Sequence, residues 1–102
     1  MDIWQLIDIS EQNLALVNPI APQKVIEAGQ AAGLNQDSRV IEFGAGYGEI
    51  LKIWGKAFGI SGLGVEIRET ACQRAKTSLA GAGVQNQISI VCADADVVTI
   101  WL

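Results

Sequence analysis

A glycine-rich turn between a strand pattern and a helix pattern constrains this chain more than any other feature. Residues Val40–Phe43 are of strand type, and three glycines follow at alternate positions, Gly44, Gly46 and Gly48. A helical pattern begins directly after them. Glycine allows the backbone to turn with positive φ and lets a ligand approach closely. A strand, a glycine turn and a helix start, in this order, predict a pocket for a nucleotide-like ligand.

Helix and strand patterns alternate along the rest of the chain. The expected elements are helical pieces over 2–17, a helix over 22–32, a strand over 39–43, a helix from the glycine turn to residue 58, a strand over 62–67, a helix over 68–82 and a strand over 87–93. This alternation predicts a parallel sheet with right-handed crossovers, which is half of a doubly wound α/β fold. The almost entirely apolar first strand predicts burial on both of its faces.

Composition excludes several classes of site. The net charge is −4 and the seven Lys and Arg residues are scattered, so we expect no nucleic-acid binding by this segment. The absence of histidine excludes a histidine-based triad, and with no close cysteine pair we expect no metal site. We expect Cys72 and Cys92 to be small buried residues in a reducing cytoplasm. Neither a signal-peptide pattern nor a membrane-length apolar run is present, so we expect no membrane association.

The residues around the turn discriminate between nucleotide ligands. A dinucleotide fingerprint, G-x-G-x-x-G, needs its third glycine at position 49, which is Glu49. A P-loop needs Gly-Lys followed by Ser or Thr, but Lys56 is followed by Ala57. Glu42 and Glu49 flank the turn, and a phosphate among carboxylates is electrostatically unfavourable. A ligand with a cationic head group therefore fits better.

Two more carboxylates are expected at the same edge of the sheet. Glu66 closes the second predicted strand, and Asp94 follows the third. A carboxylate at the carboxyl edge of such a sheet can accept two hydrogen bonds from the vicinal hydroxyls of a ribose, as we expect of Glu66. Asp94 could accept one from an exocyclic amine. Each residue alone could equally be a solvated strand end, but three acids at successive strand ends favour a ligand site.

Three ordered motifs resemble those of the class I S-adenosylmethionine-dependent methyltransferases. Glu42–Gly48 is similar to the E/D-x-G-x-G-x-G motif of that family, Gly64–Ile67 to its second motif, and Cys92–Ala95 to its third, with Ala93 in place of glycine. The resemblance covers roughly residues 36–95. It implies the first half of a Rossmann-like parallel sheet with strand order 3-2-1 and flanking helices. It also implies S-adenosyl-L-methionine as cofactor and S-adenosyl-L-homocysteine as product.

The resemblance implies a role for each motif position. In the first motif, Gly44, Ala45 and Gly46 would pass under the methionine part of the cofactor. Glu42 would meet the methionine ammonium group. The cofactor-binding positions implied by the three motifs together are Glu42, Gly44, Ala45, Gly46, Gly48, Glu66, Ile67, Asp94 and Ala95.

The second and third motifs would hold the adenosine. Glu66 would bind the ribose hydroxyls, and Ile67 would lie against the adenine face. Asp94 would accept from the adenine amine, and the Ala95 amide would donate to a ring nitrogen. The implied reaction is in-line transfer of the sulfonium methyl group to a nucleophile, for which the protein supplies mainly positioning and the cofactor the reactivity.

The chain departs from this family in its length. The family's domain is about twice as long, so residues 1–102 correspond to a single half-domain, with a helical leader over 1–35, a core over 36–95 and a strand-like tail over 96–102. The tail resembles the family's fourth strand. In the family's strand order, 3-2-1-4, two strands separate the third from the fourth, so the tail would have to cross about 14 Å without a linker. Three interpretations remain: the third strand continues, the tail pairs with a second chain, or the chain is a fragment or internal deletion.

Several functional interpretations therefore stay open. The first is the cofactor-binding half of a methyltransferase, with an unknown acceptor and no assignable catalytic residue; whether this form is an enzyme stays undecided. The second is a non-enzymatic truncated or engineered fragment that oligomerises through its open sheet edge. The third is an NAD-type dinucleotide binder, disfavoured by Glu49. We expect a homo-oligomer, and exchange of C-terminal strands is one way to form it.

Overall fold

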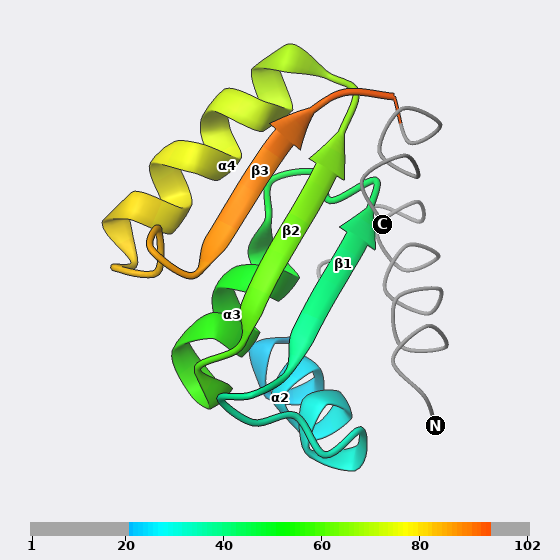
Figure 1. The fold of residues 1–102 in the computed structure, drawn as a ribbon, viewed down its shortest axis with the longest axis vertical. Coiled ribbons are helices and arrows are strands. Elements are labelled where there is room, and N and C mark those ends of the chain that lie inside the picture. Colours follow the sequence, from blue (N-terminus) through cyan, green and yellow to red (C-terminus); the bar gives the residue numbers. More distant parts are fainter. Residues whose placement is uncertain (1–20, 95–102) are drawn as a thin grey trace.

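The computed structural model describes residues 21–94, which contain three helices and three strands (Figure 1). The helical pieces expected over 2–17, the Ala95 site and the strand-like tail lie outside the described residues. The elements in chain order are α2 (Pro22–Ala31), β1 (Arg39–Phe43), α3 (Glu49–Phe58), β2 (Ser61–Glu66), α4 (Glu69–Gly81) and β3 (Ile88–Cys92).

The three strands form one parallel sheet in the order β1-β2-β3. Glu42 in β1 pairs with Gly64 in β2, and Glu66 in β2 pairs with Cys92 in β3. All three arrows point the same way in Figure 1, so the carboxyl ends of the strands meet at one edge. The predicted α/β Rossmann-like sheet, with strand order 3-2-1 and flanking helices, is confirmed.

Helices α3 and α4 pack against the same face of the sheet. Residues at alternate positions of a strand share a face, and on this face Val40 and Ile88 are buried with 1% and 2% of their surfaces exposed. Leu51 of α3 is fully buried beside Gly62 and Gly64 of β2, and Trp54 of α3 is buried beside Gly29 of α2. The indole Nε1 of Trp54 donates a 2.7 Å hydrogen bond to the Val25 carbonyl, which joins α3 to α2. The core therefore lies between the sheet and its two crossover helices.

The first strand is not equally buried on its two faces. Val40 and Glu42 are buried, whereas Ile41 and Phe43 on the opposite face are only half-buried. The prediction of burial on both faces of β1 is therefore wrong for the opposite face. An apolar composition shows that a strand can be covered on both sides, but not which neighbours cover it.

The two cysteines differ in exposure. Cys72 of α4 is buried, as predicted, but Cys92 is exposed. The prediction that both are buried is wrong for Cys92 because it ends β3, a strand at the edge of the described sheet. The alternation of residues indicated that Cys92 lies on the same face as Ile88 and Ile90, but not that its strand lies at an edge of the sheet. None of the described helices has the length and apolar character needed to cross a membrane.

Close packing at β2 depends on glycine. A Cβ atom at Gly64 would lie 2.7 Å from Ile90 Cδ1, 2.9 Å from Ala45 Cβ and 3.1 Å from Leu51 Cδ1. These distances are shorter than van der Waals contact, and the neighbours are themselves packed in the core. The absence of a side chain at this position lets the glycine turn, α3 and β3 approach β2.

We predict that Gly64→Ala destabilises the fold by about 1 to 3 kcal/mol through overpacking. Gly81→Ala is the matched control, because a Cβ there meets nothing within 4 Å. Alanine at this end of α4 should leave the stability unchanged or raise it by up to about 1 kcal/mol. Urea denaturation followed by far-ultraviolet circular dichroism measures both effects. Equal stabilities of the two variants would contradict the packing argument.

Candidate functional site

A cleft opens at the carboxyl edge of the sheet. It has a volume of about 220 Å³, and residues from the ends of all three strands line it. The lining residues are Gly44, Val65, Glu66, Ile67, Ala93 and Asp94. This edge is where parallel α/β sheets bind their ligands.

The glycine turn forms one wall of this edge. Gly44, Gly46 and Gly48 have φ values of 70°, 59° and 74°, in the left-handed region that other residues rarely adopt. The backbone N–H groups of Gly44 and Ala45 both donate to the Val65 carbonyl oxygen, at 2.8 and 3.0 Å. The turn is thereby fixed to the end of β2, and three glycines are needed because the chain reverses within five residues.

The Glu66 carboxylate joins the turn to the end of β2. Its Oε1 accepts a 2.9 Å hydrogen bond from the Gly46 N–H. Its Oε2 accepts hydrogen bonds from the Arg68 N–H, at 2.9 Å, and from Arg68 Nε, at 3.0 Å. The residue is 4% exposed. A carboxylate has about four acceptor positions, so three of them are already used by these donors.

These contacts set the protonation state of Glu66. Burial by itself would raise the pKa of this carboxyl, but the hydrogen bonds from the Arg68 side chain, the Arg68 N–H and the Gly46 N–H, with the Arg68 charge, lower it below its ordinary value. Glu66 is therefore ionised at neutral pH, and both of its oxygens act only as acceptors.

Arg68 is a part of the site that the sequence analysis missed. Its side chain is 61% exposed and forms an ion pair with Glu66. A Cβ at Gly46 would lie 3.8 Å from Arg68 Nη2, so the guanidinium also lies beside the turn. A ligand that needs both oxygens of Glu66 would have to displace this side chain, which its exposure permits. The sequence did offer a signal for this contact, because the basic residue Arg68 stands two positions after Glu66 at the strand end.

The structure separates Glu42 from the cleft. This side chain is 1% exposed and lies on the face of β1 that α3 and α4 cover. It does not line the cleft, whereas Glu66 and Asp94 do. Of the three acids, Glu66 ends β2, whereas Glu42 lies one residue before the end of β1 and Asp94 lies two residues after β3. Glu42 lies on the buried face of its strand, beneath the turn. Its predicted contact with an ammonium group stays a prediction.

The remaining predicted positions divide between the cleft and the core. Ile67 lines the cleft with 67% of its surface exposed, and Asp94 lines it too. Gly48 lies away from the cleft, where a Cβ would meet Ala75 and Ile90 at 3.4 and 3.7 Å. Gly48 therefore caps the start of α3, and its missing side chain lets α4 pack closely against it. Among the described residues, no group of three or more His, Cys, Asp or Glu could hold a metal ion.

Comparisons with known proteins give relatives of one kind of fold. No family model matches the sequence. The uncharacterized protein YjhP of Escherichia coli is 28% identical over 95 residues, which are 93% of this chain and 38% of that protein.

Two crystal structures extend this likeness. A SAM-dependent methyltransferase from Thiobacillus denitrificans, in complex with S-adenosyl-L-homocysteine, has a TM-score of 0.73 and 33% identity over 93% of this chain and 38% of its own. One from Geobacter sulfurreducens, in the same complex, has a TM-score of 0.72 and 33% identity over 76% of this chain and 31% of its own. The chain thus spans less than two fifths of the length of these relatives.

We predict that the ionised Glu66 stabilises the fold in a pH-dependent way. Because its pKa is lowered in the folded state, its contribution is present above the unfolded pKa of about 4.3 and is lost as the pH falls through the folded value. Glu66→Gln should cost about 1 kcal/mol at pH 7, since the amide oxygen keeps only part of the hydrogen bonding. Urea denaturation of both proteins between pH 7 and pH 3 should show this difference shrinking. A difference that is as large at pH 3 would contradict it.

Proposed function

We propose that this chain, whose described part has the fold of the first half of a class I S-adenosylmethionine-dependent methyltransferase, binds S-adenosyl-L-methionine in the cleft at the carboxyl edge of its sheet. It would form the cofactor-binding half of a methyltransferase. The observation that carries the proposal is the Glu66 carboxylate, held at the mouth of the glycine turn by the Gly46 N–H.

The adenosine would lie across the ends of β2 and β3. Glu66 would accept hydrogen bonds from the two ribose hydroxyls once the Arg68 side chain has moved from Oε2. Ile67 offers an exposed apolar surface for the adenine face. Asp94, which also lines the cleft, would accept from the adenine amine, and the Ala95 amide would donate to a ring nitrogen.

The methionine part would lie along the turn. Gly44 is exposed, and a Cβ at Gly46 would meet only Arg68 within 4 Å, so a ligand can approach the backbone there. Glu42 lies buried beneath the turn, and a negative charge on it would favour a cationic head group over a phosphate. The cofactor supplies the reactive methyl group, and these residues orient it. We assign no catalytic residue and no methyl acceptor.

The acceptor would be bound outside the described residues. The matching relatives are more than twice as long as this chain, which leaves room in them for a second half. We propose the layout of leader 1–35, core 36–95 and tail 96–102 within one half-domain, and a cytoplasmic location. The alternative is a non-enzymatic fragment that assembles through its sheet edge. It is favoured by β1, whose outer edge has no strand partner within residues 21–94. An NAD-type binder is disfavoured, as in the sequence analysis, by Glu49 in place of a third glycine.

We predict that S-adenosyl-L-homocysteine binds this chain and that Glu66→Gln weakens binding at least tenfold. Loss of one good hydrogen bond to a charged acceptor, about 1.5 to 3 kcal/mol, corresponds to that factor or more. Glu69→Gln is the matched control, because it removes the same charge from an exposed position three residues away. Calorimetric titration measures both variants, with NAD as the competing ligand. Equal losses in the two variants, or tighter binding of NAD, would contradict the ribose role.

We predict that the chain forms a homo-oligomer. An open apolar strand edge invites pairing with a second copy. Light scattering across a concentration series should give a mass of at least two chains, and Ile41→Lys in β1 should shift the population towards monomers. A single monomeric species at high concentration would count against both the oligomer and the fragment alternative.

A further inference from the structure

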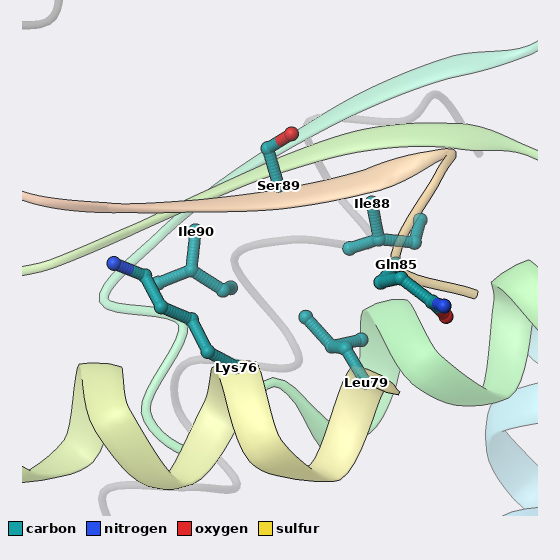
Figure 2. Close-up of a pocket in the computed structure, with 6 residues that line it drawn as sticks. All are labelled: Lys76, Leu79, Gln85, Ile88, Ser89 and Ile90. Atoms are coloured by element: carbon teal, nitrogen blue, oxygen red, sulfur yellow. The ribbon is translucent and has the colours of Figure 1, made fainter. Parts of the chain in front are cut away.

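Cys92 continues a row of side chains that faces α4. Figure 2 shows Ile88 and Ile90 pointing from β3 towards α4, with Ser89 pointing away. Side chains alternate along a strand, so Cys92 shares the face of Ile88 and Ile90. Unlike these two residues, Cys92 is exposed to solvent.

Cys72 ends the matching row on α4. Cys72, Ala75 and Leu79 are all buried, with 1%, 0% and 2% of their surfaces exposed. A helix advances about 5 Å in three to four residues, and a strand about 6.6 Å in two. Since α4 runs back along β3, moving from Leu79 to Cys72 matches moving along β3 to Cys92. The two rows therefore end with the two cysteines opposite each other.

The contacts of the sulfur atoms agree with this placement. Cys72 Sγ donates to the Glu66 carbonyl oxygen at 3.1 Å, and Cys92 Sγ lies 3.9 Å from the carbonyl oxygen of the next residue, Ile67. Burial, and next a hydrogen bond with the Cys92 side chain, raise the pKa of the Cys72 thiol to about 11. The two thiols are thus direct neighbours, one enclosed and one open to solvent.

We infer that Cys72 and Cys92 form a reversible dithiol–disulfide site whose oxidant is a hydroperoxide. The exposed Cys92 thiol loses its proton, and the thiolate sulfur attacks the peroxide. The O–O bond breaks, Cys92 becomes a sulfenic acid, and the other oxygen takes up that proton and leaves as water or an alcohol. The Cys72 sulfur then attacks the Cys92 sulfur. The S–O bond breaks, and the hydroxide leaves as water with the Cys72 proton. For hydrogen peroxide, two thiols become one disulfide and the peroxide becomes two waters.

The disulfide would tie α4 to the end of β3 beside the cleft. It would remove the Cys72 S–H that donates to the Glu66 carbonyl, and it would draw Cys92 towards α4, two residues before Asp94. Resting on the proposed function, oxidation should therefore weaken S-adenosyl-L-homocysteine binding several-fold, with recovery after reduction.

The test treats the reduced full-length chain with one equivalent of hydrogen peroxide. Intact mass should fall by two hydrogens, both thiols should become inaccessible to a thiol reagent under denaturing conditions, and dithiothreitol should reverse both changes. Nonreducing electrophoresis should show the mass of one chain. A mass gain from oxygen addition, or a covalent dimer, would overturn the inference.

Two serine variants separate the roles of the cysteines. Cys72→Ser keeps the exposed thiol and a hydroxyl donor for the Glu66 carbonyl, and peroxide should then add oxygen to Cys92. Cys92→Ser should leave the buried Cys72 thiol unreacted at the same peroxide dose. Equal reaction of both variants would contradict the assigned order. Binding is measured separately: a reduced protein that fails to bind S-adenosyl-L-homocysteine refutes the proposed function, whereas an oxidised protein with undiminished affinity refutes only the coupling.

Discussion

The hydrogen bond from the Gly46 N–H to the Glu66 carboxylate is the interaction on which the site depends. It crosses from the glycine turn after β1 to the end of β2, so it fixes the relative positions of two segments twenty residues apart. The adjacent hydrogen bonds from the Gly44 and Ala45 N–H groups to the Val65 carbonyl also hold the turn against the end of β2. Because the acceptor is an ionised carboxylate, the same contact that holds the turn also keeps a negative charge at the mouth of the cleft.

The glycines of this region serve packing as well as conformation. Gly44 and Gly46 allow the turn itself, whereas Gly48 and Gly64 admit side chains from α4, α3 and β3. A single sheet of three strands has little core, so close approach of the crossover helix α3 to β2 is needed to enclose Leu51. The same short segments therefore build both the cleft and the core, so a substitution that changes the packing of one also shifts the other.

The fold was largely predictable, and the site was predictable in part. Alternating strand and helix patterns gave the parallel sheet, because a short strand followed by an amphipathic helix has few ways to bury its apolar side chains. Motif positions brought Gly44, Glu66, Ile67 and Asp94 to one cleft, since parallel strands end at one edge. Burial of Glu42, exposure of Cys92 and the Arg68 contact were not predicted. Each depends on which neighbour covers a side chain, which a local pattern does not encode.

What the sequence by itself determined is the order of elements and the residues at their ends. Glycine spacing, apolar periodicity and the positions of the acids are local properties, and they are enough to locate a ligand edge and to favour a cationic ligand over a phosphate. Only the tertiary structure decided which acids face that edge, that the Arg68 guanidinium pairs with Glu66, and that Cys72 lies opposite Cys92. These facts arise from strand parity combined with helix packing, and such contacts join residues that are distant along the chain.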